Sequence, residues 1–561
     1  MAIAADVTDM VAGWRHMRTP SGVTRVQARL LQAGAGLFGP VGFADGAWRC
    51  FPPPLLDQML GAAGQPGGPK DPAWQALVDA AEAELAAAPA WRPAADDWLF
   101  GIGAGWWLPG HAARILALKR DGVAYANFVH DVLPLTVPEH CSAALVRSFA
   151  QHFALTCLLA DHVVCNSEAS RVDFAAWQRR LLPGQVIPAS VLRLDGASAR
   201  PAQPGRRDFV LAVGTVESRK NQLGLLRAWL RLLREHGEAA VPRLVIVGLH
   251  GHWSEQVVEL CEASPELRRA VEFRHAVPDA ELDALYAGCI FTVFNSYAEG
   301  WGLPVSESLA HGRVPLVTDL PVLREAGGAH AVYVEVDNVP ALAAAAWALI
   351  GDPAGLRARE GAMRAAPPPP SWRELAERCA AFLGSPPALA LDRAPLPAGL
   401  VVPCGLPPMP DLPVLPPPQQ STGALLRSGN GWSHQEDWGC WAVAPGELAL
   451  RLPLDPAWRC PAVRLSLHLM PPPGGHVVRA RAAGGAWVNW PITQECWVVL
   501  DAAWPMGDVL EVAFDVGRGV AVPPDHRMLG FGLRALSLTP GPMPAVAPAG
   551  LLTRFNPLRK P

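Results

Sequence analysis

Short apolar runs alternate with helical segments between residues 208 and 319, and this rhythm constrains the fold more than any other feature. Residues 208–214 (DFVLAVG) predict a buried strand, and residues 221–237 (NQLGLLRAWLRLLREHG) predict a helix with Asn221 at its N-cap. The next strand is expected at 243–248 (RLVIVG). Strands and helices in this order build a parallel sheet with helices on both faces, and ligands of such sheets bind at the carboxyl ends of the strands.

The first 200 residues show the same rhythm less regularly. Residues 22–34 (GVTRVQARLLQAG) predict a helix, and residues 122–131 (GVAYANFVHD) predict a strand that ends in His130 and Asp131. Residues 196–207 (GASARPAQPGRR) are typical of an inter-domain loop. We therefore expect two Rossmann-like α/β domains, at 1–200 and 201–383.

A proline-rich run at 384–423 predicts a semi-rigid linker or surface strap, because proline fixes φ and removes a hydrogen-bond donor. The hydrophobic period then changes to two, as in AVRLSLHLM, which predicts an antiparallel β-sandwich at 424–561. Trp432, Trp438 and Trp441 lie close together there. They either stack on sugar rings or fill the core, and the core is the more common place for tryptophan.

The composition excludes several classes of protein. The net charge is −4 over 561 residues, and without a long basic run we expect no nucleic-acid partner. The 11 cysteines are scattered without a Cys-x-x-Cys motif, which favours buried thiols in a reducing compartment. We see no secretory signal and no apolar stretch of about 18 residues. A cytoplasmic location is expected, with peripheral contact at the inner face of the membrane left open.

The segment 295–312 (NSYAEGWGLPVSESLAHG) predicts a strand end, a loop and a helix. Pro304 suits the first helical turn, where its missing N–H costs nothing. The free N–H groups of Leu303 and its neighbours then form a helix N-terminus, which attracts phosphate. Gly300 and Gly302 allow a ligand to approach the backbone closely.

Charged residues surround this predicted phosphate site. Glu299 and Glu307, eight positions apart, are placed to accept hydrogen bonds from hydroxyls at two ends of one ligand. A second strand-to-helix loop, 213–222 (VGTVESRKNQ), supplies Arg219 and Lys220, which could neutralise a diphosphate without a metal. The sequence has no motif for a metal-held diphosphate. The alternative is that these acids and bases are ordinary solvated surface groups.

These motifs resemble the donor domain of retaining glycosyltransferases of family 4, which have the GT-B fold. The resemblance rests on the Glu-x7-Glu pair, the EGWGLP core, the GTVESRKN loop and the VIVGLHG turn. SGVTRV, NFVHDVLPLTVPE and ADHVVCNSEASRVDF resemble the acceptor domain of the same family, so the similarity covers residues 1–383. Two departures are Thr215, where many members have arginine, and Trp301, where phenylalanine is usual.

The resemblance implies a role for each site residue. Arg219, Lys220 and the Leu303 amide would bind the donor diphosphate, and Glu307 would hold the ribose. Glu299 would hold hydroxyls of the transferred sugar, and His130 would approach that sugar from the other domain. The remaining donor-binding positions are the glycines and the valine that would line the diphosphate, ribose and base: Gly22, Gly214, Gly248, Gly300, Gly302 and Val277.

The expected function is therefore the retaining transfer of a hexose from a nucleotide-sugar to a glycan or lipid-linked oligosaccharide in surface polysaccharide synthesis. GDP-mannose is the expected donor and UDP-glucose the next candidate, with no metal or other cofactor required. His130 could act as a general base, as a positioning group or as a core histidine. An alternative function is a catalytically inactive GT-B protein whose β-sandwich binds or senses glycan. A processive polysaccharide synthase is a weaker alternative.

Overall fold

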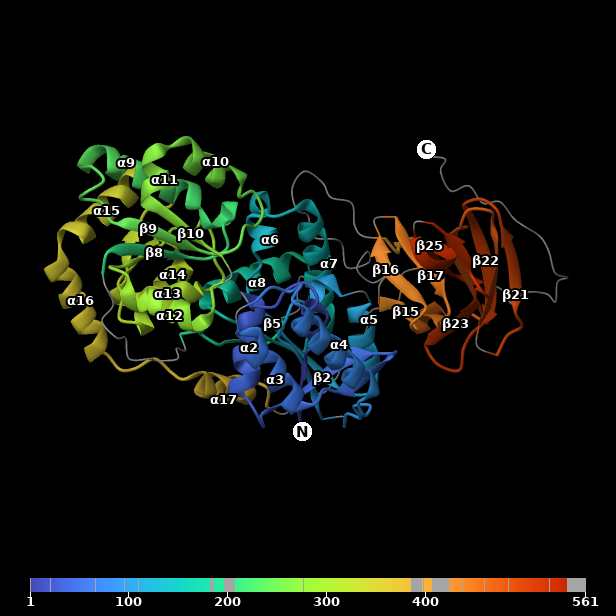
Figure 1. The fold of residues 1–561 in the computed structure, drawn as a ribbon. Helices are drawn as coiled ribbons and strands as arrows, with labels where there is room; N and C mark the ends of the chain where they lie inside the picture. Colours follow the sequence, from blue (N-terminus) through green and yellow to red (C-terminus); the bar gives the residue numbers. More distant parts are fainter. Residues whose placement is uncertain are drawn as a thin grey trace.

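The computed structural model of this chain describes residues 2–20, 22–65, 67–94, 96–108, 110–181, 186–195, 207–275, 277–384, 396, 398–405, 423, 425–436, 438–458, 460–482, 484–523 and 525–541. Figure 1 shows three bodies in a row: an α/β lobe in the centre, a second α/β lobe on one side and an all-β part on the other. We call residues 2–195 the first lobe, residues 207–370 the second lobe and residues 396–541 the C-terminal module.

The first lobe contains a seven-stranded sheet of order β3-β2-β1-β4-β5-β6-β7. Every neighbouring pair is parallel except β2 and β3, which form an antiparallel hairpin at the edge. β5 is buried along its whole length, as expected for a strand covered on both faces. The strands are β1 (Ile3–Asp6), β2 (Phe38–Ala44), β3 (Ala47–Cys50), β4 (Trp98–Gly101), β5 (Ala124–Val129), β6 (His162–Cys165) and β7 (Ala189–Val191).

Helices cover both faces of this sheet, and the longest, α7, carries a broad buried face. The helices of the first lobe are α1 (Thr8–Gly13), α2 (Val23–Ala33), α3 (Pro53–Ala63), α4 (Pro72–Ala87), α5 (His111–Arg120), α6 (Leu133–Thr136), α7 (Ala143–Leu159) and α8 (Glu168–Leu181). The chain then enters the second lobe.

The second lobe contains a six-stranded parallel sheet of order β10-β9-β8-β11-β12-β13, the strand order of a dinucleotide-binding fold. The strand order reverses between β8 and β11, which makes their carboxyl ends the expected ligand site. The strands are β8 (Phe209–Val213), β9 (Arg243–Val247), β10 (Val271–Arg274), β11 (Thr292–Phe294), β12 (Pro315–Thr318) and β13 (Val332–Val334).

The helices of the second lobe follow the predicted rhythm, and the predicted N-cap of α9 is confirmed: the Asn221 side chain accepts the Gly224 N–H at 3.0 Å. These helices are α9 (Gln222–His236), α10 (Glu255–Ala263), α11 (Pro265–Ala270), α12 (Asp279–Gly288), α13 (Leu303–Ala310), α14 (Pro321–Gly327), α15 (Val339–Gly351) and α16 (Pro353–Ala365). The two lobes together are the GT-B arrangement that the sequence predicts.

No single helix among the described segments is long and apolar enough to cross a membrane. Only α15 and α16 taken together pass that test of length and composition, and they are bent by 89° at their junction. Side chains of α15, among them Leu342 and Ala346, belong to the buried core of the second lobe.

The C-terminal module has two antiparallel sheets whose inward side chains share one hydrophobic core. One sheet has the order β16-β17-β25-β19-β22, with β14 and β24 also on β25, and the other has the order β15-β18-β23-β20-β21. Its strands are β14 (Val402–Pro403), β15 (Arg427–Ser428), β16 (Trp432–Glu436), β17 (Gly439–Ala444), β18 (Leu448–Pro453), β19 (Ala462–Met470), β20 (His476–Ala482), β21 (Val488–Ile492), β22 (Cys496–Ala503), β23 (Val509–Asp515), β24 (Val520–Val522) and β25 (Asp525–Gly541).

The three clustered tryptophans of the module are mostly structural. Trp432 packs edge-on against Phe514 and Phe531 in the core, and Trp441 is buried. Trp438 stands at an angle of 71° to the Trp441 ring, with centroids 5.2 Å apart. The core interpretation therefore holds for Trp432, whereas Trp441 is buried against Trp438 outside the shared core cluster.

The proline-rich run was expected to form no sheet, and this prediction is wrong for one short piece. Val402 and Pro403 pair antiparallel with Leu536 and Ala535 of β25. Proline is tolerated because β14 is an edge strand that pairs with β25 alone. No second neighbouring strand needs a hydrogen bond from the N–H that proline lacks. Most of 384–423 lies outside the described residues.

The expected boundary at residue 383 assigns one helix to the wrong lobe. Helix α17 (Trp372–Phe382) leaves the second lobe and packs against α2 of the first, as Figure 1 shows. Leu375 and Cys379 are fully buried in the first lobe's core. The sequence predicts the apolar face of α17, but it does not show against which lobe that face packs.

Replacing Leu375 by alanine should therefore destabilise the first lobe. A buried leucine deletion costs about 2–5 kcal/mol through lost burial and the cavity left behind. Urea unfolding followed by tryptophan fluorescence measures this loss, and Arg378→Ala on the exposed face of α17 is the control. Equal stability of the two variants would contradict the docking of α17.

Candidate functional site

The loops after β8 and β11 lie side by side where the strand order of the second lobe reverses. The Asn295 side chain donates to the Asn221 carbonyl at 2.9 Å, and the Tyr297 N–H donates to the Arg219 carbonyl at 2.9 Å. These bonds fix the loop that carries Arg219 and Lys220 against the loop that carries Glu299. Residues 79 positions apart thereby form one site.

Glu299 is held by both cations of the neighbouring loop. Lys220 Nζ lies 2.6 Å from Glu299 Oε1, and Arg219 Nη1 lies 3.1 Å from Glu299 Oε2. Arg219 also donates to the Ala298 carbonyl at 2.7 Å and pairs with Glu217 at 2.8 Å. The Glu299 side chain is only 6% exposed, so this is a largely buried ion cluster.

In this cluster, attraction between opposite charges opposes the effect of burial, which favours the neutral forms. Burial alone would raise the pKa of Glu299, but Arg219 and Lys220 hold that pKa at about 2. Burial lowers the pKa of Lys220 despite the attraction of Glu299. The pKa of Arg219 is raised, because Glu299 and Glu217 outweigh its desolvation. A diphosphate bound here would have to share or replace the carboxylate partners of both cations.

The start of α13 lies beside the same cluster. Lys220 Nζ stands 4.6 Å from the centroid of the Phe294 ring, and a Cβ added at Gly302 would lie 3.4 Å from that ring. Gly302 caps α13 with φ 96°, a left-handed conformation that favours glycine, and Leu303 is the first helical residue. A Cβ at Gly214 would lie 3.7 Å from the Lys220 side chain. Lys220 and the start of α13 therefore both lie against the Phe294 ring.

Glu307 contacts the opposite lobe. Its Oε1 accepts a hydrogen bond from Arg25 of α2 at 3.1 Å, and its Oε2 accepts one from the Tyr286 hydroxyl at 2.8 Å. Arg25 also pairs with Asp279 at 2.6 Å, and Arg29 pairs with the other oxygen of Asp279 at 3.0 Å. Sequence reasoning did not select these partners, although Arg25 lies within the SGVTRV motif.

The other predicted donor-binding positions occupy three places. Gly22 caps α2 with φ 52° and ψ −120°, a backbone conformation closed to residues with a Cβ. A Cβ at Gly248 would lie 2.0 Å from the Gly214 carbonyl oxygen, so the loops after β8 and β9 are in backbone contact. Val277 packs against the apolar cluster that contains Tyr286. The structure thus connects Val277 to Glu307 through that tyrosine.

His130 and Gly300 meet at the interface of the lobes. A Cβ at Gly300 would lie 2.3 Å from the His130 carbonyl oxygen, so only glycine fits there. The Gly300 carbonyl accepts hydrogen bonds from Ser167 at 2.9 Å and from Ser170 at 3.2 Å, both in the first lobe. The contact at Gly300 therefore brings the backbone next to Glu299, in the second lobe, against the backbone of His130 in the first lobe.

The His130 ring is neutral and already hydrogen-bonded. Its Nε2 lies 2.7 Å from the Ile102 carbonyl, which can only accept, so Nε2 carries the proton and Nδ1 does not. Burial lowers the pKa of His130 to about 4. A ring this weakly basic is a poor general base near neutral pH, and the geometry favours a positioning group.

Asp131 directly follows His130 and lies near the same ion cluster, although no sequence motif indicates a role for it. It is close enough to Arg219, Lys220 and Glu299 for each to shift its titration. Burial raises the pKa of Asp131 overall, with Arg219 opposing that shift. A raised pKa favours the neutral carboxyl, which would repel an incoming anion less than a carboxylate does.

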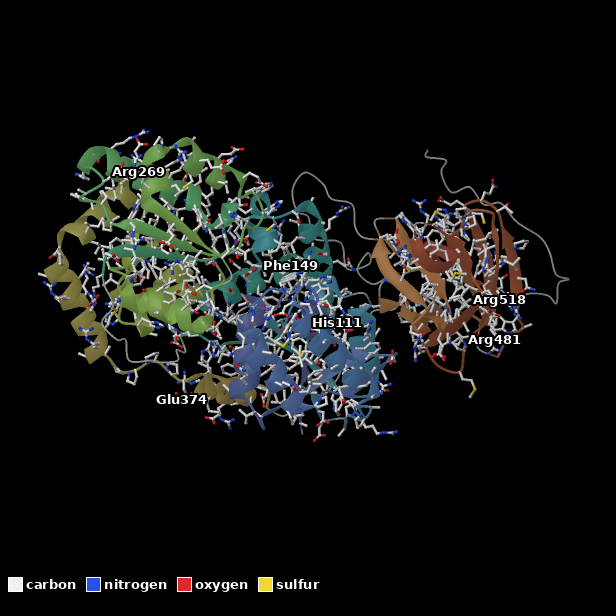
Figure 2. The ribbon with its side chains drawn as sticks, in the orientation of Figure 1. His111, Phe149, Arg269, Glu374, Arg481 and Arg518 are labelled. Atoms are coloured by element: carbon white, nitrogen blue, oxygen red, sulfur yellow. The ribbon has the colours of Figure 1, made fainter. Side chains whose placement is uncertain are left out.

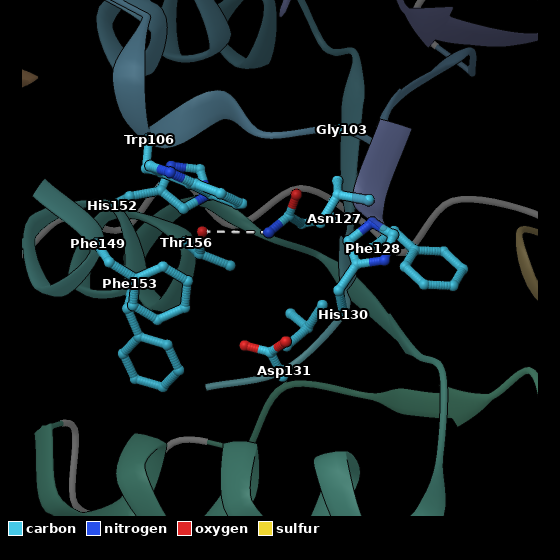
Figure 3. A pocket seen from close by; sticks show the side chains of 12 residues that line it. Gly103, Trp106, Asn127, Phe128, His130, Asp131, Phe149, His152, Phe153 and Thr156 are labelled. Carbon is cyan, nitrogen blue, oxygen red and sulfur yellow. Dashed lines mark hydrogen bonds between the residues drawn. The ribbon is translucent and has the colours of Figure 1, made fainter. Parts of the chain in front are cut away.

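A pocket opens beside His130 and Asp131 at the carboxyl end of β5 (Figure 3). It is a small, partly open hollow between β5 and α7. Its wall combines aromatic rings with polar groups: Trp106, Phe149, Phe153, Asn127, His152 and Thr156. An aromatic wall with a few polar groups suits a sugar ring.

A buried polar network lies beneath this pocket. Asp6, at the end of β1, lies 2.7 Å from His111 Nε2, and Asp9 accepts the Ala104 N–H at 2.7 Å (Figure 2 labels His111). Gln27 bridges the Asp6 carbonyl and the Asp9 carboxylate. The network holds the ends of β1 and β4 in place, at the point where the first lobe's strand order reverses.

No group of three or more His, Cys, Asp or Glu side chains is placed to hold a metal ion within the part of the chain that the structure describes. The described cysteines are all free thiols, and most are buried.

Comparison with known proteins gives a family match that overlaps the second lobe. Residues 197–363 match the family described as glycosyl transferases group 1. The serotype-specific mannosyltransferase WbdA of Escherichia coli is 28% identical over 245 residues, which is 40% of this chain and 29% of WbdA. The O-antigen chain mannosyltransferase B of Escherichia coli is 30% identical over 212 residues, 38% of this chain and 50% of that protein. This chain thus spans half or less of the length of these relatives.

Solved structures with a related fold include the Anabaena protein HepE in complex with UDP-glucose. It shares 15% sequence identity with this chain at a TM-score of 0.48, and the match covers 68% of this chain and 99% of HepE. The protein TarM matches at 13% identity and a TM-score of 0.41, over 52% of this chain and 55% of TarM.

Replacing Glu299 by glutamine should strengthen the binding of inorganic pyrophosphate and weaken the fold. The substitution leaves two largely buried cations without their shared carboxylate, and breaking such a pair costs about 3–5 kcal/mol. Pyrophosphate would then supply the missing negative charge, and we expect about tenfold tighter binding, which corresponds to about 1.4 kcal/mol. Calorimetry and thermal melts measure both effects. Glu377→Gln on the surface of α17 is the control, and weaker binding to the Glu299 variant would contradict this prediction.

The protein should lose stability as the pH falls from about 6.5 to about 4. Burial lowers the pKa of His130 to about 4 and that of His152 to about 3. Below about pH 6.5 these two histidines bind protons in the unfolded chain but stay neutral in the folded chain. The free energy of unfolding therefore falls as the pH falls. Urea unfolding at a series of pH values measures the slope. His152→Gln should reduce the slope by up to about 1.4 kcal/mol per pH unit, and an unchanged slope would contradict burial of a neutral ring.

Proposed function

We propose that this chain, whose residues 197–363 match the glycosyl transferases group 1 family, transfers a hexose from a nucleotide-sugar to a glycan or lipid-linked oligosaccharide. The observation that carries the proposal is the pair of cations, Arg219 and Lys220, in the loop after β8, with Lys220 and the start of α13 against the same Phe294 ring. A departing nucleoside diphosphate gains negative charge as its bond to the sugar breaks. Fixed cations and a helix N-terminus stabilise that charge most strongly in the transition state.

The proposed reaction retains the anomeric configuration and needs no metal. The bond from the sugar carbon to the phosphate oxygen breaks, and the acceptor oxygen bonds to the same carbon on the same face. The acceptor's proton passes to the departing phosphate oxygen, so no protein base is required. The weak basicity of the buried His130 ring supports this route.

For the donor we propose GDP-mannose, with UDP-glucose as the second candidate. The two Escherichia coli relatives are mannosyltransferases, which supports mannose as the transferred sugar. For the acceptor we propose a sugar bound in the pocket between β5 and α7, where Trp106 supplies an aromatic face.

We propose two tasks for Glu299. Both of its oxygens are engaged by Lys220 and Arg219, so its first task is to orient these cations. We propose that it also accepts a hydroxyl of the donor sugar, since a carboxylate has about four lone-pair sites. Loss of activity in a Glu299 variant would therefore mix a binding effect with a structural one.

Lys220→Ala is the cleaner test of function. We expect sugar transfer or slow donor hydrolysis by the wild-type chain, and about a 10²–10³-fold loss of turnover in the variant, because one preorganised positive charge is gone. Mass spectrometry of a nucleotide-sugar panel in the presence of EDTA measures the reaction. The control is Lys70→Ala, which removes an exposed lysine of the first lobe.

Three results would contradict parts of the proposal. Loss of activity in EDTA would overturn the metal-free mechanism. Inversion at the sugar carbon, followed by proton NMR, would overturn retention. A wild-type chain that consumes none of the donors but binds glycan would favour the inactive carbohydrate-binding protein instead.

A further inference from the structure

Glu307, the expected ribose ligand of the second lobe, is held by an arginine of the first. Arg25 Nη1 lies 3.1 Å from Glu307 Oε1, and Arg25 Nη2 lies 2.6 Å from Asp279 Oδ1. The Arg25 side chain is 20% exposed and the Glu307 side chain 27%, so this contact between the lobes is partly buried. Glu307 and Arg25 are 282 positions apart in the sequence.

The Glu307 carboxylate keeps room for a ligand. Oε1 accepts from Arg25 and Oε2 accepts from Tyr286. A carboxylate offers about four lone-pair sites, so about two remain for the neighbouring hydroxyls of a ribose. Two partners on opposite oxygens also prevent the carboxylate from rotating. The site is therefore oriented before the ligand arrives.

The position of Arg25 follows from the start of α2. Gly22 has φ 52° and ψ −120°, and the Arg25 N–H donates to the Gly22 carbonyl at 3.1 Å in the first helical turn. This turn directs Arg25 to the second lobe. Its fork-shaped guanidinium contacts Glu307 and Asp279 at once, which a lysine ammonium cannot do with the same geometry.

We propose that Arg25 is a positioning residue for the donor ribose, completing the ribose site of the second lobe from the first lobe. The inference rests on the proposed function, and it adds a residue to that site. The ribose site is then complete only when the lobes are closed, so binding of the nucleoside favours the closed form.

The competing interpretation is that Arg25 is only a latch between the lobes. Both interpretations predict weaker nucleotide binding when Arg25 is lost. They differ in whether the loss depends on the ribose hydroxyls. A ribose analogue without those hydroxyls gains nothing from an oriented Glu307, but it still gains from closed lobes.

The experiment measures binding of GDP and UDP, each beside its 2′,3′-dideoxy analogue, by calorimetry on the full chain. We expect Arg25→Ala to bind the natural nucleotide about tenfold more weakly than the wild type, a change of about 1.4 kcal/mol. The same variant should bind the dideoxy analogue within about twofold of the wild type. Arg25→Lys should give an intermediate loss.

Arg29→Ala is the matched control, because it removes a neighbouring arginine of α2 that pairs with Asp279 but not with Glu307. It should bind all four nucleotides as the wild type does. An equal loss with natural and dideoxy nucleotides in Arg25→Ala would overturn the positioning role and support the latch. Unchanged binding in Arg25→Ala would overturn the inference and leave the proposed function standing. A folded wild type that binds neither GDP nor UDP would overturn both.

Discussion

One largely buried carboxylate, Glu299, determines the charge and shape of the crevice. Without it, Arg219 and Lys220 would be two like charges in a largely buried place, which costs about 3–5 kcal/mol. With it, both side chains are held in fixed positions by short ion pairs. The proposed diphosphate would exchange partners with cations that are already oriented, so the protein would lose little side-chain entropy on binding it.

The sequence predicts the parts of this site better than their connections. Short apolar runs and the Asn221 cap place the elements of the second lobe, and the EGWGLP segment places a helix start. These features are local, so periodicity and capping chemistry predict them. The pairing of Glu299 with Lys220 depends on two strands that are adjacent only in the folded sheet. The contact of Arg25 with Glu307 requires two lobes to meet, which no local pattern encodes.

The same limit explains the errors. Helix α17 has a clear apolar stripe, but its stripe fits either lobe, and the chain order suggested the nearer one. Val402 and Pro403 lie in a run whose composition opposes regular structure, yet β25 offers a free edge to pair with. In both cases a surface supplied by distant residues decides the outcome. Gly300 differs from these cases, because the sequence motif correctly predicts a position of close approach. The group that approaches it, the His130 carbonyl, lies in the other lobe and cannot be read from the motif.

Among the residues that the structure describes, the C-terminal module packs against the first lobe. Leu425, just before β15, is buried in a first-lobe cluster with Trp48 and Leu116, and β15 lies against α5. Figure 1 shows the second lobe on the far side of the molecule from this attachment. The module and the pocket lined by Trp106 therefore belong to one packed unit, and any movement between the two lobes would leave the distance from the module to that pocket unchanged.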